Sequence, residues 1–432
     1  MDRQGFGRFL YRKRRRDMTT SRIPGLHKMA RAERLDAVAD AADLSADTKT
    51  ALSRNSATAD LADHLSENVI STIEVPLGVA TNLVVDGAEV LVPMATEESS
   101  VIAAVCNGAR ACRASGGVMT EADDPVMIAQ VQITNVPDVA AGQAALLAQE
   151  ATIKAVCDGC DPMLVSLGGG FRGLEARALE NGMLVLHLHV DVRDAMGANT
   201  VNTMAETLAP QIEDWTGGTV GLRILSNLAD RRLVRARARW SAEEIGADTV
   251  AGILNAYAFA AADPYRAATH NKGIMNGIDA VALATMNDTR AIEAGAHAYA
   301  ATRGPGYAPL TRYWQEGEDL IGEIELPLAM GIVGGATRAH PTAQAALEIM
   351  QADGADRLSR VTAAVGLIQN FSALRALATE GIQRGHMSLH ARNVAITAGA
   401  TGVQVDQIAQ EMIARKTIRE DVARALLSEG AS

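Results

Sequence analysis

Short runs in which apolar and polar positions alternate dominate the first half of the chain. Residues 82–93 form two apolar runs around Asp86-Gly87, which predicts a β-hairpin with a tight turn. Alternation of the same kind predicts further strands over 127–134, 183–190, 220–225 and 233–240. Helical spacing or alanine enrichment predicts helices over 31–53, 101–114, 144–156 and 200–215. The chain after Glu243 is expected to be mostly helical, with an amphipathic helix over 403–415 before a tail of mixed charge.

The order of these elements favours an α+β fold with more than one unit. Composition changes near 122–125, and strands and helices then follow one another up to about residue 226, as in a small α+β domain. With 432 residues and 48% hydrophobic content, the chain can bury a large core divided over two or three domains.

Charge and composition exclude several classes of partner. The net charge of −11 disfavours binding to a nucleic-acid backbone, and the 3% of aromatic residues argues against base stacking, so we predict no nucleic-acid partner. No apolar run approaches the roughly 20 residues that span a bilayer, so we expect no membrane partner and a cytoplasmic location. The basic stretch 9–16 lacks a following apolar segment, so it is not a secretory signal. Residues 1–20 are expected to be a disordered tail or an over-long start ahead of Met18, and a nucleic-acid or membrane tether is the alternative.

The segment 263–279 holds the strongest candidate for chemistry. Six of the 40 basic residues are lysine, and one of them, Lys272, lies between Asn271 and Gly273 in a polar stretch. Because a lysine ammonium is compact and its pKa moves readily, such a residue is a candidate electrophile or proton donor. An exposed lysine on a loop is the alternative.

Three glycine-containing segments could hold an anion. Residues 168–173 formally match G-x-G-x-x-G, but a lone match is weak support for a Rossmann site. Residues 194–204 follow a strand and lead into a helix, with Asn199 and Thr200 as N-cap types, so they could hold a pyrophosphate or form an ordinary capped turn. Residues 331–337 are the third segment, a flexible glycine loop that is compatible with an anion.

Histidine and cysteine patterns do not predict a metal site. His386 and His390 share a helix face, but the glutamate of the zinc motif H-E-x-x-H is missing, so proton transfer is the simpler role for His386. Cys157 and Cys160 form a single C-x-x-C that we interpret as incidental cytosolic thiols. The other seven histidines are expected to be structural, and no metal is expected.

Together these motifs resemble 3-hydroxy-3-methylglutaryl-CoA reductase of the soluble bacterial class (class II), from about Ser21 to the end of the chain. The markers are Glu67 to Ile70, Asn82 with its hairpin, Val92-Pro93, Glu97-Glu98, Asp194 to Met204, Arg223 to Asp230, the lysine segment, Asn287-Asp288, Gly334-Gly335 and Gly385 to Met387.

The resemblance implies an architecture. A large domain around a central helix would comprise 21–125 and 227–380, with a small ferredoxin-like, non-Rossmann cofactor domain at 126–226 and a C-terminal helical flap at 381–432. The match at 168–173 would then be accidental. The family builds its active site across a dimer interface, so a homodimer or larger homo-oligomer is expected.

The resemblance also implies site residues, which are named here by role. The catalytic positions are Glu98, Lys272, Asp288 and His386. The substrate-binding positions are Ser100, Arg266, Asn276 and Asn227. The cofactor positions are Asp161, Asp194, Met196, Gly197, Ala198, Asn199, Gly334 and Gly335. The family's Glu-Glu-Pro-Ser departs to Glu-Glu-Ser-Ser here, and Ser99 lacks the stiffness of the proline.

The implied reaction interconverts HMG-CoA and mevalonate plus CoA by two hydride transfers, through mevaldyl-CoA and mevaldehyde. Lys272 would stabilise the oxyanion, Glu98 and Asp288 would tune that lysine and transfer protons, and His386 would protonate the CoA thiolate. Asp161 matches the aspartate by which family members select NAD(H), so NAD(H) is favoured over NADP(H), although Asp158 could take its place.

Two other functions remain open from the residues alone. One is a generic Rossmann NAD-dependent dehydrogenase of a small hydroxy acid, which would not depend on CoA. The other is a non-catalytic CoA- or nucleotide-binding protein, which would lack at least one of the four catalytic residue types, although all four are present.

Overall fold

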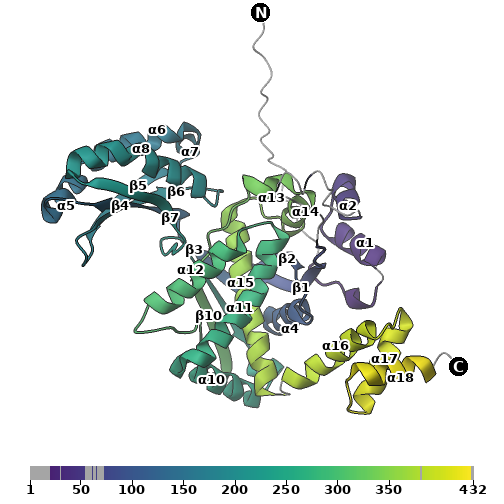
Figure 1. Ribbon diagram of the computed structural model, residues 1–432. Coiled ribbons are helices and arrows are strands. Elements are labelled where there is room, and N and C mark those ends of the chain that lie inside the picture. The colour runs from purple at the N-terminus through teal and green to yellow at the C-terminus, as the bar shows by residue number, and fades with distance from the viewer. Residues whose placement is uncertain are drawn as a thin grey trace, which may run out of the picture.

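The computed structural model describes residues 20–29, 31–53, 61, 65, 73–379 and 382–429. The predicted tail before residue 20 and the marker Glu67 to Ile70 therefore lie outside the described residues, apart from Thr20 itself. The described chain forms a large α+β domain with a six-stranded sheet, a smaller unit with a four-stranded sheet, and a group of C-terminal helices (Figure 1).

The six-stranded sheet forms one wall of the large domain. Its order is β2-β1-β3-β8-β10-β9. The strands are β1 (Leu77–Val85), β2 (Ala88–Ala95), β3 (Val118–Ala122), β8 (Leu233–Trp240), β9 (Thr311–Glu316) and β10 (Asp319–Pro327). The predicted hairpin is confirmed: β1 and β2 pair antiparallel around Asp86 (φ 54°) and Gly87 (φ 75°), both in the left-handed region that a tight hairpin turn requires.

Strand β8 shows how the sheet separates core from solvent. Ala236, Ala238 and Trp240 are buried on one face. Arginines at the alternate positions, Arg235 and Arg239 among them, form ion pairs with acidic residues of the β9–β10 hairpin. The period of two along a strand therefore gives one apolar face and one ion-paired face.

Helices α11 (Pro264–Ala284) and α15 (Ala355–Ala378) cross the core of the large domain next to this sheet (Figure 1). They pack closely because glycines lie at the contact, and a Cβ on Gly366 would be 2.8 Å from Ile278 Cδ1. Of the described helices, α15 alone is long and apolar enough to cross a membrane, but 67% of its most apolar stretch is buried inside the protein. Polar residues such as Asn370 interrupt its apolar positions, so the helix does not contradict the expectation that no continuous apolar run approaches roughly 20 residues.

The smaller unit has its own sheet and core. Strands β4 (Val126–Thr134), β5 (Gly170–Ala178), β6 (Leu184–Asp191) and β7 (Thr219–Ser226) pair antiparallel in the order β5-β6-β4-β7. Helices α5 (Val139–Ala148), α6 (Glu150–Cys160), α7 (Pro162–Ser166) and α8 (Ala198–Thr216) lie together on one side of this sheet (Figure 1). A Rossmann fold needs parallel strands, so the generic Rossmann alternative is wrong, and Gly168 to Gly170 simply form the turn into β5.

Several predicted boundaries differ from the structure. The helix expected at 31–53 is two, α1 (Arg31–Ala41) and α2 (Ala46–Ser53), because Asp43 takes a left-handed conformation (φ 49°). The helix expected at 144–156 is broken at Gln149 into α5 and α6. The β9–β10 hairpin interrupts the region after Glu243 that was expected to be mostly helical.

The remaining helices complete the domains. The shorter ones are α4 (Val101–Arg113), α9 (Ala242–Ile245), α10 (Ala247–Ala262), α12 (Thr289–Thr302), α13 (Gly335–Ala339) and α14 (Pro341–Met350). At the C-terminus, α16 (Ile382–Thr397), α17 (Val403–Ala414) and α18 (Glu420–Glu429) surround a small apolar cluster of their own (Figure 1). The tail expected after residue 415 therefore contains a helix.

Candidate active site

The candidate lysine is presented by helix α11. Asp263 caps this helix by accepting a hydrogen bond from the Arg266 backbone N–H (2.9 Å), and Pro264 fits the first turn because its missing N–H has no partner there. Lys272 follows on the outer face with its side chain 63% exposed, whereas its neighbour Asn271 is fully buried. The lysine is therefore held by a rigid helix and open to a ligand.

Glu98 is the described partner of this lysine. Lys272 Nζ donates to Glu98 Oε2 over 3.1 Å, although the two residues lie 174 positions apart. Glu98 belongs to the turn between β2 and α4, where its backbone N–H donates to Thr96 Oγ1 (3.1 Å). The turn ends at Ser100, which adopts φ 76°, a conformation that costs a non-glycine residue about 1–3 kcal/mol. Strain of this size next to a charged pair is typical of functional sites.

Arg266 and Asn276 lie on the same helix as Lys272. Arg266 is half-buried, burial lowers the pKa of its guanidinium, and it forms no ion pair with any carboxylate of the described chain. Asn276 is half-buried one turn beyond Lys272, on the same side of α11. Asn227, in the β7–β8 connection, is exposed. These side chains are free to take a polar ligand.

Asp288 does not meet Lys272 within one chain. Its Oδ1 caps α12 by accepting from the backbone N–H groups of Arg290 and Ala291 (3.1 Å each), and the Arg290 guanidinium pairs with the same atom (3.2 Å). Helix α11 ends shortly before Asp288, and the Asn287 N–H still donates to the carbonyl oxygen of Ala282 in its last turn. Asp288 therefore lies close to the C-terminal end of α11. With a rise of 1.5 Å per residue, the backbones of Lys272 and Asp288 are roughly 15 Å apart along the helix, beyond the reach of the two side chains.

His386 belongs to helix α16 of the C-terminal group. Its side chain lies outside the described residues, so its assignment as a proton donor stays a prediction.

The loop between β6 and α8 presents a helix N-terminus. Gly197 (φ 101°) is the N-cap, and no side chain caps the first turn, which begins at Ala198. The expectation that Asn199 or Thr200 would be the cap is wrong, because only glycine fits this position: an added Cβ would lie 2.6 Å from Val192 Cγ1. Uncapped N–H groups and the dipole of a 19-residue helix suit an anion such as a pyrophosphate.

Asp161 lies next to that N-terminus. It caps α7 by accepting from the Leu164 N–H at Oδ1 (2.9 Å), while its Oδ2 accepts a long hydrogen bond from Thr200 Oγ1 (3.4 Å). Asp158 is engaged elsewhere, because it accepts from Lys154 Nζ (2.5 Å) and from the Phe171 N–H (2.9 Å). Of the two carboxylates, Asp161 is the one that the structure brings to α8.

The same loop docks onto the large domain. Asp194 Oδ1 accepts from the Ala355 N–H (2.8 Å) at the start of α15, and its carbonyl oxygen accepts from the Ile332 N–H (2.9 Å). Gly331 passes so close that an added Cβ would lie 2.5 Å from the Met196 nitrogen. The Gly331 N–H donates to Asn287 Oδ1 (2.8 Å), beside Asp288. Asp194 and Met196 therefore meet Asn287 and the first residues of the predicted loop 331–337, Gly331 and Ile332, in one place.

Comparison with known proteins shows the family. The family model described as hydroxymethylglutaryl-coenzyme A reductase matches residues 30–391. The chain belongs to this reductase family. It is 53% identical over 413 residues to the 3-hydroxy-3-methylglutaryl-coenzyme A reductase of Archaeoglobus fulgidus, covering 94% of each chain.

Solved structures of the reductase family show the same fold. The enzyme from Streptococcus pneumoniae is 36% identical, with a TM-score of 0.81 over 94% of this chain and 99% of that one. A class II structure from the same organism, bound to NADPH in open conformations, gives a TM-score of 0.79 over 94% of this chain and 100% of that one. The predicted family and the α+β, non-Rossmann fold are confirmed, and with them the general reaction of the reductase with small-molecule substrates and a nicotinamide cofactor.

One buried residue beside this loop was missed by the sequence analysis. Arg232 is 3% exposed and donates to the carbonyl oxygens of Ala195 (3.1 Å) and Met330 (2.5 Å), so it ties the loop between β6 and α8 to the large domain. Burial lowers the pKa of Arg232 to about 10. In the sequence it sits in the charged run Asp230-Arg231-Arg232, which is typical of a solvated turn, and no local signal distinguishes it.

Proposed function

We propose that this chain interconverts HMG-CoA and mevalonate plus CoA by two hydride transfers with NAD(H), through mevaldyl-CoA and mevaldehyde. The observation that carries the proposal is the 3.1 Å contact between Lys272 and Glu98 on a rigid helix, in a chain that belongs to the reductase family. An ammonium in this position stabilises the negative charge that develops on the thioester oxygen as it is reduced. Glu98 holds the lysine in place and is within reach to exchange a proton with it.

The site is completed by a second copy of the chain. Asp288 cannot approach the Lys272 of its own chain, and the Lys272–Glu98 pair is largely exposed, as expected of a half-site at an interface. In a homodimer, Asp288 of one subunit would approach Lys272 of the other. Together with Glu98, it would exchange protons with that lysine. Asp288 lies beside the loop that would hold the cofactor, which supports this. The thioester carbonyl of the substrate must lie between the lysine and the nicotinamide, so a lysine that serves this cofactor would also be close to Asp288.

The substrate's own charges have matching groups. Arg266, half-buried and without an ion pair, is the candidate for the carboxylate of HMG or mevalonate. Asn276, Ser100 and Asn227 would position the remaining hydroxyl and carbonyl oxygens. His386 would protonate the leaving CoA thiolate from the flap, 381–432, whose movement would also allow the spent cofactor to be exchanged between the two hydride transfers.

The small unit, 126–226, would hold the nicotinamide cofactor, whose chemistry is to supply or accept hydride. Gly197, Ala198 and Asn199 present the anion site at the start of α8, and Asp194 and Met196 fix the loop against Gly331. Gly334 and Gly335 follow in the neighbouring large-domain loop, at the start of α13. These positions would hold the dinucleotide on the small unit and the neighbouring loop of the large domain.

The preference for NAD(H) rests on Asp161. Its carboxylate beside α8 can accept from a ribose 2′-hydroxyl and repels a 2′-phosphate. Since the S. pneumoniae relative is described as bound to NADPH, NADP(H) is the competing cofactor. In Asp161→Ala, the ratio of kcat/KM for NADH over NADPH should fall about 10–100-fold, the worth of a charged hydrogen bond.

Asp138→Ala is the matched control, because Asp138 caps another helix of the same unit by accepting from the Ala141 N–H (3.0 Å). It should lower stability without changing the cofactor ratio. An unchanged ratio in Asp161→Ala would remove the argument for NAD(H) while leaving the reductase assignment intact.

NAD⁺ reduction by mevalonate, measured with and without CoA, tests the reaction itself. Turnover that requires both mevalonate and CoA supports the proposal. Turnover without CoA would indicate a simple hydroxy-acid dehydrogenase, and no turnover with either nicotinamide would indicate a binding protein.

A further inference from the structure

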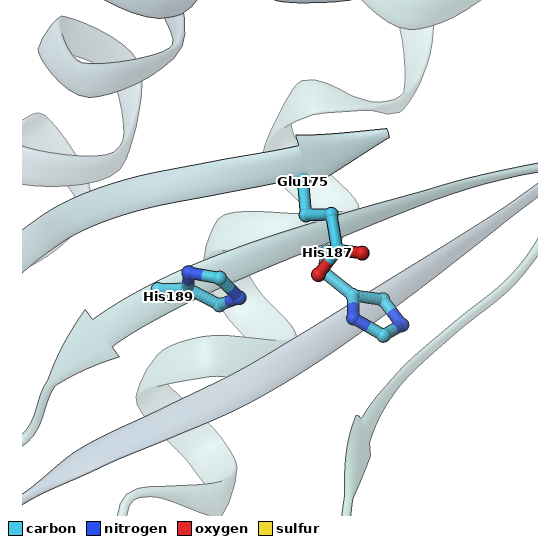
Figure 2. A group of neighbouring side chains, drawn as sticks. All are labelled: Glu175, His187 and His189. Atoms are coloured by element: carbon cyan, nitrogen blue, oxygen red, sulfur yellow. The ribbon is translucent and has the colours of Figure 1, made fainter. Parts of the chain in front are cut away.

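Three ligand-type side chains gather on the small sheet, on the face away from its helices. Figure 2 shows Glu175 of β5 with its carboxylate directed toward His187 and His189 of β6. The alternate β6 residues Leu186 and Leu188 are fully buried in the helix-covered core, so the two histidines share the opposite face. One potential ligand atom from each residue lies within 4.8 Å of the other two.

The backbone register brings these residues together. Glu175 on β5 is the direct partner of His187, and His187 is in turn the partner of Gln130 on β4. His189 follows two residues later and is paired with Gly173, which leaves room beside its ring: a Cβ on Gly173 would meet no atom within 4 Å. The spacing His-x-His on one strand with a carboxylate on the next therefore places three donors around an open space.

Two of the donor groups are not satisfied by protein contacts alone. The Nε2 of His189 is buried and has no hydrogen-bond partner in the part of the chain that the structure describes. The Nε2 of His187 receives two donors, the Gln130 amide (2.8 Å) and an Arg177 guanidinium nitrogen (2.9 Å), which compete for a single lone pair. Burial, with nearby arginine charge, lowers the pKa of both histidines.

We infer that Glu175, His187 and His189 bind one divalent transition-metal ion of the zinc class, with water completing the shell. Two imidazoles and one carboxylate are a donor set that Zn²⁺ accepts, and a fourth, open position suits a surface site. The ion would join β5 to β6 just before β6 runs into the cofactor loop at Asp194. Its role would be to brace that loop rather than to take part in hydride transfer.

The surrounding charges set the affinity. Arg177 and Arg231 lie within electrostatic reach of the histidines and oppose a cation, whereas Asp230 favours one. The side chain of Arg177 is 43% exposed and can turn into solvent when an ion displaces it from His187. Removing Arg177 should therefore tighten metal binding, an outcome that adventitious binding elsewhere on the surface does not predict.

The test is Co²⁺ and Zn²⁺ binding to the full chain after treatment with chelator. We expect one ion per chain, with a Co²⁺ visible spectrum of nitrogen and oxygen ligands and no thiolate band from the four cysteines. In His187→Asn, His189→Asn and Glu175→Gln, the Kd for the metal should rise at least roughly 10–100-fold. Mutating a residue that only hydrogen-bonds to a metal ligand already weakens binding by that factor, and losing a ligand itself should cost no less. Arg177→Ala should lower Kd, and saturating Zn²⁺ should raise the Tm of the wild type but not of the ligand variants.

His390→Asn is the matched control, because it removes an exposed histidine that could bind zinc together with His386. It should leave Kd unchanged. Stoichiometric binding that persists in Glu175→Gln with an unaltered spectrum, or an absence of binding by the folded wild type and Arg177→Ala alike, would overturn the inference. The readout involves no turnover, so it is independent of the proposed reaction.

Discussion

Mixing two inactive variants would show where Asp288 acts. Lys272→Ala and Asp288→Ala each remove one catalytic group, and each alone should lower kcat at least about 10²–10³-fold, as loss of an oxyanion-stabilising group does. The two backbones are roughly 15 Å apart along α11, so the proposed pair can form only between two subunits. In a mixed dimer both mutations then fall in one site, and the other site is intact.

The expected recovery can be calculated. After unfolding and refolding at equal concentrations, half of the dimers are mixed and each has one intact site of two, so about a quarter of wild-type activity should return. The control mixes Lys272→Ala with Glu98→Ala: because Lys272 and Glu98 touch within one chain, both sites of that mixed dimer are damaged and no activity should return. The assay is the rate of mevalonate- and CoA-dependent NAD⁺ reduction. Recovery in the control mixture, or none in the first mixture, would refute the assignment of Asp288 to the partner's site.

Two further predictions concern the large domain. Burial and the neighbouring Glu293 carboxylate raise the pKa of Asp279 to about 8, so the folded state holds a proton that the unfolded chain releases near pH 4. The free energy of unfolding should therefore fall as pH rises from about 4 to 8. Asp279→Asn should make this fall smaller by roughly 1–2 kcal/mol, after allowance for solvent screening. Denaturant unfolding of both proteins from about pH 5 to 9 checks this, and the same pH dependence in both would contradict it. Gly331→Ala places a methyl 2.5 Å from the Met196 nitrogen and should raise KM for the nicotinamide while destabilising by about 1–3 kcal/mol, whereas Gly304→Ala, with no atom within 4 Å, should do neither.

Elements with a strong local signal could be predicted from the sequence. The hairpin at 82–93 was found because Asp86-Gly87 suits a turn with two positive φ angles, and β8 because its arginines alternate with buried residues. Strand β5 was missed because its exposed and half-buried positions follow no regular period. The β9–β10 hairpin was missed because its strands are stabilised by pairing with β8, which is far away in the sequence. No local pattern reveals that pairing.

The site was predictable only in part, for a physical reason. A helix N-terminus after a strand can be read locally, and the one at Gly197 was expected, although its cap was assigned to the wrong residues. The contact between Lys272 and Glu98 joins residues 174 positions apart, so it came from the resemblance and not from any pattern. Arg232 shows the limit most clearly, since its burial depends on where two domains meet.

The most direct test of the central claim compares wild type with Lys272→Ala in NAD⁺ reduction by mevalonate and CoA. The account predicts that Lys272→Ala folds normally, keeps its affinity for the nicotinamide and loses at least about 10²–10³ in kcat, while Lys154→Ala, which removes a lysine paired with Asp158 at the surface, keeps full activity. A folded Lys272→Ala enzyme that turns over mevalonate at nearly the wild-type rate would contradict it.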